Sequence, residues 1–240
     1  MKKYILAIAI ITLASLYLYL ANAYIYYRLN KAGLKLPVPP TSLQANGRPL
    51  YVALGDSLTA GLGAEKYQES FPYLLARNLS GGSPASLRVL AVPGNRSDDL
   101  IKNQLEPAIA AQPDIITLLI GTNDIHGFYS REKFKKNYQF ILERLAKETK
   151  AKVYAISIPW LGAPGLFSPP LNYYFDYKTA GFNKIIKQLA AAYGVEYLDI
   201  AAPTRALGRT GGPYYAADSF HPSAAGYALW AELIYNGIKQ

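Results

Sequence analysis

From Leu50 onward, short apolar runs alternate with longer amphipathic stretches. The apolar runs predict strands at Leu50 to Leu54, Leu87 to Val92, Ile115 to Ile120, Val153 to Ile158 and Val195 to Ile200. The amphipathic stretches predict helices at Ser70 to Asn78, Asp98 to Ala111, Arg131 to Lys150, Thr179 to Tyr193 and Ser223 to Lys239. Because the strands alternate with helices and are apolar on both faces, the pattern predicts an α/β domain. Its five-stranded sheet would be parallel, with helices covering each side.

A different pattern occupies the N-terminus, where no charged residue occurs from Tyr4 to Tyr27. A helix of that length reaches across a hydrocarbon core of about 30 Å, and its far end is rich in tyrosine, which favours the membrane interface. A cleaved signal peptide is the competing interpretation, because Lys2-Lys3 precedes the run and Ala21-Asn22-Ala23 resembles a cleavage site. We favour a retained anchor because the apolar run continues past that site. A buried helix of the globular domain ranks third.

The segment between the anchor and the first strand predicts a linker. Its residues from Lys35 to Pro49 are rich in proline and lack apolar periodicity. The expected organisation is therefore an anchor or signal peptide over 1–28, a linker over 29–49 and the α/β domain over 50–240. Orientation is ambiguous from Lys and Arg alone, because basic residues flank both ends of the apolar run. The likeness to a signal peptide favours an extracytoplasmic domain.

Composition narrows the function classes. The net charge of +9 comes in large part from five basic residues in the acid-free N-terminal segment: Lys2, Lys3, Arg28, Lys31 and Lys35. The rest of the chain has no dense basic run, which argues against a nucleic-acid partner. The chain has no cysteine, so disulfides and thiolate metal sites are excluded. With two histidines only, a His-rich zinc site is not expected, and the sequence predicts neither a metal nor a cofactor.

Polar side chains follow three of the predicted strands at the point where each strand ends. They form the groups Gly55-Asp56-Ser57, Pro93-Gly94-Asn95 and Gly121-Thr122-Asn123-Asp124, and "DSFHPSAAG" from Asp218 to Gly226 precedes the last helix. Ligands of parallel α/β sheets bind at the carboxyl ends of the strands. The groups are therefore expected to meet at one edge of the sheet.

A serine, a histidine and a carboxylate in such a place suggest acyl transfer. The Ser57 hydroxyl needs a base to take its proton, and His221 can be that base. Asp218, three residues before His221, can orient the imidazole and stabilise its charged form. The developing oxyanion needs preorganised donors, which the N–H groups of Ser57 and Gly94 and the side-chain amide of Asn123 can supply.

These residues resemble the motif blocks of the SGNH, or GDSL-type, serine hydrolases. "GDSL" at 55–58, Gly94, "GTND" at 121–124 and "DSFHP" at 218–222 follow the order of that family's four blocks. The resemblance implies a three-layer α/β/α sandwich of the SGNH, flavodoxin-like type. It also implies Ser57, His221 and Asp218 as the catalytic triad, and Ser57, Gly94 and Asn123 as the oxyanion hole. Because Leu58-Thr59 follows the serine, the Gly-x-Ser-x-Gly elbow of other α/β hydrolases does not fit.

Several of these residues have plainer interpretations. Ser57 in isolation would be a helix cap or turn residue, and Asp56 is expected to brace the loop. We expect His126 to be a loop or pocket-wall residue. The segment from Trp160 to Tyr177 predicts a long loop that lines an acyl pocket, contacts lipid headgroups or packs over the sheet. The glycines of "GLGAEK" at 61–66 do not complete a phosphate-binding motif.

Taken together, the motifs predict a membrane-tethered serine esterase or lipase-like acyl hydrolase that forms an acyl-enzyme on Ser57. Its substrate would be a small-molecule, lipid or acylated-glycan ester, and its N-terminal helix would bind the membrane, with secretion after cleavage as the alternative. One rival function is O-deacetylation or O-acyl transfer on envelope glycans. Another is a catalytically silent binding module that keeps the same fold.

Overall fold

The computed structural model describes residues 2–39, 49–81, 86–160, 166–167, 169–210 and 212–239. Its centre is a sheet of five strands in the order β2-β1-β3-β4-β5, and every neighbouring pair is parallel. The strands are β1 (Leu50–Gly55), β2 (Ser86–Val89), β3 (Ile115–Leu119), β4 (Lys152–Ile156) and β5 (Glu196–Leu198). The predicted five-stranded parallel sheet is confirmed, although β2 and β5 are shorter than their apolar runs.

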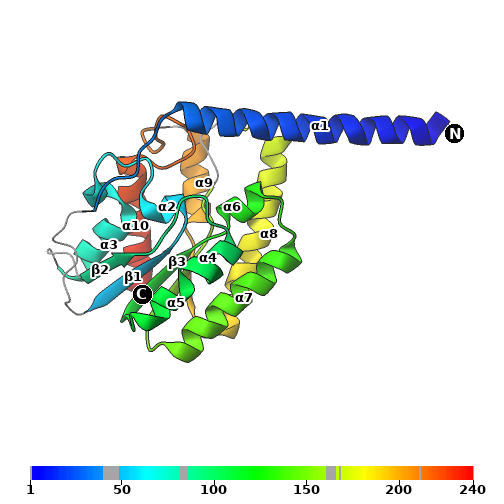
Figure 1. Ribbon diagram of the computed structural model, residues 1–240. Coiled ribbons are helices and arrows are strands. Elements are labelled where there is room, and N and C mark those ends of the chain that lie inside the picture. The colour runs from blue at the N-terminus through cyan, green and yellow to red at the C-terminus, as the bar shows by residue number, and fades with distance from the viewer. Residues whose placement is uncertain are drawn as a thin grey trace.

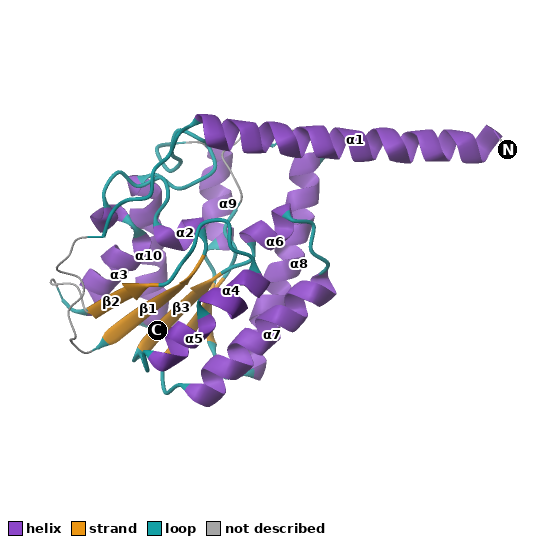
Figure 2. Cartoon of the chain, viewed as in Figure 1, coloured by secondary structure: helices purple, strands orange, loops and turns teal. Residues whose placement is uncertain are grey.

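Helices cover both faces of this sheet (Figures 1 and 2). The described helices are α1 (Lys2–Lys31), α2 (Ser57–Ala60), α3 (Phe71–Leu79), α4 (Ser97–Asn103), α5 (Leu105–Ala110), α6 (Thr122–His126), α7 (Arg131–Glu148), α8 (Leu171–Ala192), α9 (Ala201–Thr210) and α10 (Ala224–Ile238), with a 3₁₀ turn, η2, at Tyr67–Glu69. The three-layer α/β/α sandwich is therefore confirmed.

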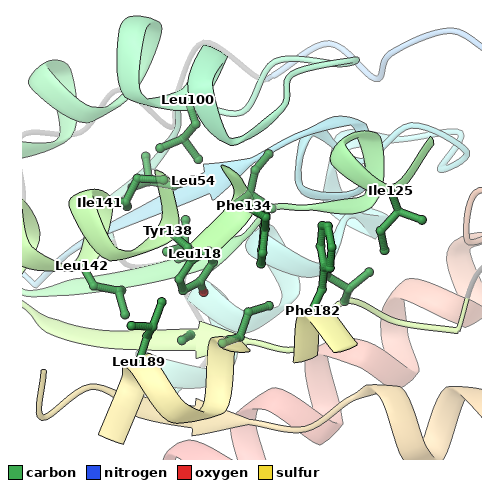
Figure 3. Packing of buried hydrophobic residues seen from close by; sticks show 14 of the residues in the cluster. Leu54, Leu100, Leu118, Ile125, Phe134, Tyr138, Ile141, Leu142, Phe182 and Leu189 are labelled. Carbon is green, nitrogen blue, oxygen red and sulfur yellow. The ribbon is translucent and has the colours of Figure 1, made fainter. Parts of the chain in front are cut away.

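The alternation of side chains along β1 divides the core in two. Val52 and Leu54 face the larger cluster, which α4, α5, α7 and α8 complete, whereas Tyr51 and Ala53 face a second cluster completed by α3 and α10. Figure 3 shows the larger cluster, in which the Phe134 ring of α7 lies close to Phe182 of α8. Their ring centroids are 4.1 Å apart and stacked. Burial of such rings supplies much of the hydrophobic free energy that holds the layers together.

The observed helices differ from the sequence predictions at three places. The stretch predicted as one helix over Asp98 to Ala111 is divided into α4 and α5 at Gln104. Part of the predicted loop from Trp160 to Tyr177 is wrong, because α8 already begins at Leu171, directly after Pro170 at its N-cap. Proline suits a helix start, so a Pro-rich run here begins a helix where a loop was expected. Residues 161–165 and 168 of that loop lie outside the described residues. Helix α9 has no counterpart among the predicted elements.

Helix α1 projects from the domain as a long rod whose N-terminus lies far from the sheet (Figure 1). Its stretch Lys2–Arg28 is long and apolar enough to cross a membrane. The helix runs to Lys31, three residues past the boundary expected at residue 28. Residues 40–48 of the predicted linker lie outside the described residues, but Pro37 is buried against the domain.

Candidate active site

The end of β1 turns directly into α2, and this turn presents Ser57. Asp56 is the N-cap of α2, and its Oδ1 accepts a hydrogen bond from the Leu58 N–H at 3.0 Å. Ser57 is therefore the first helical residue, and the cap role that Ser57 could have had belongs to Asp56. Glycine is required at position 55, because a Cβ there would lie 2.4 Å from the Leu119 carbonyl oxygen of β3.

The structure brings Ser57, His221 and Asp218 into one chain of hydrogen bonds. Ser57 Oγ lies 2.9 Å from His221 Nε2, and His221 Nδ1 lies 2.5 Å from Asp218 Oδ2. All three residues are buried. This is the arrangement in which a histidine can take the serine proton while the carboxylate holds its tautomer.

Asp218 has a second role in the turn that carries His221. Its Oδ1 accepts hydrogen bonds from the N–H groups of Phe220 and His221, both at 2.9 Å. Burial alone would raise the pKa of Asp218, but the hydrogen bonds and charge of His221 and the two N–H groups hold that pKa below its ordinary value. Asp218 thus stays ionised beside the imidazole and also fixes the turn. The two roles considered for this residue are compatible.

Gly94 and Asn123 face the same cavity as Ser57 and His221. The cavity has a volume of about 300 Å³, and these four residues contribute to its lining. Gly94 has φ of +80°, a left-handed conformation that favours glycine. Apart from its chain neighbours, no heavy atom of the described residues lies within 4 Å of the position its Cβ would take. The Asn123 Nδ2 donates to the Asn95 carbonyl oxygen at 3.1 Å and lies 3.4 Å from Asp56 Oδ2. All five residues predicted for the site therefore lie at one edge of the sheet.

Gln104, which the sequence did not single out, joins the two loops of this site. Its buried side chain accepts from the Gly55 N–H at 3.0 Å and donates to the Gly55 carbonyl oxygen at 2.8 Å. The same Nε2 donates to Asn95 Oδ1 at 3.0 Å. The Asn95 carbonyl oxygen in turn accepts from Asn123, so Gln104 ties the end of β1 to the loop that follows Gly94. Nothing local in the sequence indicates this role, because it depends on a fold that brings position 104 beside position 55.

Two buried carboxyl groups brace the same region. Burial raises the pKa of Asp56 to about 7 and that of Asp124 to about 6. Asp124 accepts hydrogen bonds from the Ser97 N–H at 2.9 Å and from the Ser97 hydroxyl. Through these bonds Asp124 fixes the start of α4 just after the Gly94 loop. The expectation that Asp56 braces the loop agrees with its cap bond.

His126 lies in the wall of the cavity. Its imidazole packs among Phe167, Phe175 and Phe220, with ring centroids 6.0, 4.7 and 5.4 Å away. Its buried Nε2 has no hydrogen-bond partner within the described part of the chain. Burial, together with the nearby His221, lowers the pKa of His126 to about 4. His126 is thus a neutral pocket-wall residue at physiological pH, as expected from the sequence.

Part of the cavity wall comes from outside the predicted catalytic domain. Side chains and backbone from the end of α1 and the turn after it also line the cavity: Ile25, Tyr26, Asn30, Gly33 and Leu34. All five residues belong to the predicted anchor and linker, 1–28 and 29–49. An apolar helix facing lipid and one facing a pocket look alike in sequence, so no signal separated the two roles.

The chain is similar in sequence to known ester hydrolases. The chain is 29% identical over 202 residues to the spore germination lipase LipC of Bacillus licheniformis, a match covering 76% of this chain and 92% of the lipase. It is also 29% identical over 156 residues to an acetylxylan esterase of Geobacillus stearothermophilus, covering 61% of this chain and 69% of that enzyme.

The fold agrees with solved structures at lower identity. A lipase/acylhydrolase from Enterococcus faecalis superposes with a TM-score of 0.65 at 22% identity, covering 79% of this chain and 95% of that one. The acetylxylan esterase Axe2 of Geobacillus stearothermophilus superposes with a TM-score of 0.63 at 18% identity, covering 82% and 97%. The model of the GDSL-like lipase/acylhydrolase family matches residues 53–229. The chain therefore belongs to the GDSL-like lipase/acylhydrolase family, and its enzymatic class is that of a carboxylic ester hydrolase.

Proposed function

We propose that this protein is a membrane-tethered serine esterase that cleaves carboxylic esters through an acyl-enzyme on Ser57. The observation that carries the proposal is the hydrogen-bonded chain from Ser57 Oγ through His221 to Asp218, which borders a cavity shared with Gly94 and Asn123. A silent binding module would have no need to keep these bonds aligned.

In the proposed reaction, Ser57 Oγ attacks the ester carbonyl carbon while His221 Nε2 takes the hydroxyl proton. The carbonyl oxygen becomes an oxyanion, which the N–H groups of Ser57 and Gly94 and the Asn123 amide stabilise by hydrogen bonds. His221 then gives its proton to the leaving alcohol, and the acyl group stays on Ser57. Water, losing a proton to His221, attacks the acyl carbon; the bond from that carbon to Ser57 Oγ breaks, His221 returns the proton to Oγ, and the acid is released. Asp218 keeps the imidazole oriented throughout.

The test of this mechanism is Ser57→Ala. Hydrolysis of p-nitrophenyl acetate is expected to fall at least about 1,000-fold, because the residual rate would come from binding and oxyanion donors alone. The control is Ser130→Ala, which removes an exposed serine that caps α7. It should keep full activity. Equal turnover by Ser57→Ala and the unmutated protein would exclude Ser57 as the nucleophile.

A fluorophosphonate probe provides a second measurement that does not depend on the choice of substrate. The probe should label the protein, and the labelling should disappear in Ser57→Ala. Absence of labelling in the unmutated protein would favour the silent binding module.

Release of acetate from acetylated xylan, compared with release of decanoate from a decanoyl ester, tests the O-deacetylase alternative that the acetylxylan esterase relative raises. Acyl transfer to added sugar would identify a transferase.

The proposed tether is α1, retained in the mature protein. Contacts with the domain occur on both sides of the possible cleavage site at Ala23: the Tyr17 hydroxyl donates to the Pro169 carbonyl oxygen at 3.1 Å, and Ile25 is buried in the core. Cleavage would remove the first of these contacts. We further propose that the catalytic domain is extracytoplasmic. The chain has no cysteine, so Gln139→Cys introduces a single exposed thiol. If the domain is extracytoplasmic, this thiol should react with a membrane-impermeant maleimide in intact cells, and no reaction until the cells are lysed would contradict that orientation.

A further inference from the structure

Helix α1 has two halves with different surroundings. Residues 2–16 are exposed along their whole length. Beyond them, Leu18 and Ala21 pack against the larger core cluster, and Ile25 belongs to that cluster with an exposed fraction of 2%. The C-terminal half of α1 is therefore packed as a part of the domain. We call residues 17–31 the docked half of α1.

The docked half and the turn after it close one side of the cavity over Ser57. Tyr26 and Asn30 lie one turn apart on α1 and both line the cavity, and Leu34 follows from the turn. From the catalytic domain, Leu62 and Phe220 add further apolar surface. The lining near Ser57 thus combines a few polar groups with apolar side chains, which suits an ester carbonyl attached to an acyl chain.

Residues 2–16, the half of α1 that does not pack on the domain, are too short to span a bilayer alone, and this places the cavity near the lipid. Residues 2–16 of a helix span about 22 Å at about 1.5 Å per residue, whereas a hydrocarbon core is about 30 Å thick. A bilayer that accommodates α1 must therefore reach the docked half. Exposed tyrosines stand there, with Tyr19 exposed by 70% and Tyr24 by 56%. Tyrosine is favoured at the lipid–water interface, so the cavity beside these residues lies at membrane level.

We propose that the docked half of α1 is a wall of the acyl-binding site, and that the substrate is a lipid ester whose acyl chain enters from the bilayer along this helix. The inference rests on the proposed esterase function. On this view the helix that tethers the enzyme also selects its substrate. Removing or displacing α1 would change acyl-chain preference as well as location.

The test compares two tryptophan variants of the full-length protein in detergent. Asn30→Trp places a large ring in the cavity wall. Its matched control is Tyr27→Trp, at an exposed position of the same helix that is not part of the lining. The measured quantity is the ratio of kcat/KM for p-nitrophenyl decanoate to kcat/KM for the acetate.

Asn30→Trp is expected to lower this ratio about tenfold, since filling a hydrophobic pocket discriminates between acyl lengths by factors of about 10 to 200. Tyr27→Trp should leave the ratio unchanged. An unchanged ratio in Asn30→Trp, including equal losses of kcat/KM for both esters, would exclude the docked half of α1 as a wall of the acyl-binding site.

A separate measurement distinguishes failure of this inference from failure of the proposed function. If the unmutated protein hydrolyses neither ester and takes no fluorophosphonate, the esterase proposal fails. The wall is then tested by binding alone, using Asn30→Cys and Tyr27→Cys in the cysteine-free chain. Decanoic acid should slow maleimide modification at position 30 and not at position 27, with acetate slowing neither. Equal rates at position 30 with and without decanoic acid would contradict a wall that binds acyl chains.

Discussion

At the scale of single residues, Gly63 packs closely against the turn that carries His221 and so limits where that turn can lie. Its φ is +104°, and a Cβ would lie 2.4 Å from the Pro222 carbonyl oxygen and 3.1 Å from the His221 Cβ. The second glycine of "GLG", a pattern also found in phosphate loops, is thus explained by close packing against the turn that carries His221, the proposed base.

Gly63→Ala is therefore expected to displace His221 and to lower kcat/KM about 100-fold, as misplacement of a catalytic group by about 1 Å does. Gly194→Ala is the matched control. Gly194 also has positive φ, +66°, but no heavy atom lies within 4 Å of its Cβ position. The control should lose about 1 kcal/mol of stability from backbone strain and keep its activity. Similar activity in both variants would contradict this account of Gly63.

His126 is expected to make the protein less stable in mild acid. Its pKa is about 4 in the folded protein and about 6.5 when unfolded. Because the folded pKa is the lower one, the unfolded state binds the extra proton as the pH falls from about 6.5 to about 4, and stability is lost over that window. Between pH 7.5 and pH 5 the loss amounts to about 2 kcal/mol.

The raised pKa values of Asp56 and Asp124 act in the opposite direction, because the folded state binds their protons more tightly. A comparison with His126→Leu cancels their contributions. In urea unfolding at pH 7.5 and pH 5, the unmutated protein should lose about 2 kcal/mol more than His126→Leu. Identical pH dependence in the two proteins would mean that folding does not lower the pKa of His126.

At the scale of elements, the junction of α4 and α5 holds the active-site loops through Gln104. Gln104→Leu would leave the Gly55 N–H unpaired, at about 1–3 kcal/mol, whereas the Gly55 carbonyl oxygen would keep its hydrogen bond from the Val92 N–H at 3.2 Å. It would also release Asn95, whose carbonyl oxygen accepts from Asn123. Gln104 is thus inferred to be a positioning residue for the oxyanion donors.

We expect Gln104→Leu to lower kcat about tenfold or more while KM changes little, because oxyanion donors act mainly in the transition state. Gln139→Leu, on the exposed face of α7, is the control. It should leave kcat unchanged and change the free energy of unfolding by no more than about 0.5 kcal/mol. A purely structural role of Gln104 predicts lost stability with unchanged kcat in the folded fraction. That outcome would remove Gln104 from the catalytic account.

At the scale of the whole molecule, the docking of α1 predicts that the N-terminal segment is retained. The intact mass of the protein isolated from membranes should include the residues before Tyr24. A mass that begins at Tyr24 would show cleavage after Ala23 and would contradict the retained anchor. Because Tyr17 and Leu18 contact the domain, cleavage would also remove apolar contacts from the core.

The sequence by itself determined the parallel sheet, its five strands and the placement of Gly94, Asn123, Asp218 and His221 around Ser57. These features follow from local properties: apolar periodicity defines strands and helices, and strand ends of a parallel sheet share one edge. The N-terminal helix was also evident, because its length and composition are local.

Only the tertiary structure decided how separate segments contact one another. The clamp by Gln104, the close approach of Gly63 to His221 and the docking of α1 over the cavity all join positions that are distant in the chain. Apolar periodicity states that a face is buried but not which surface covers it. For that reason the sequence separates the predicted anchor from the domain over 50–240, whereas in the folded chain the end of α1 lines the cavity that also contains Ser57.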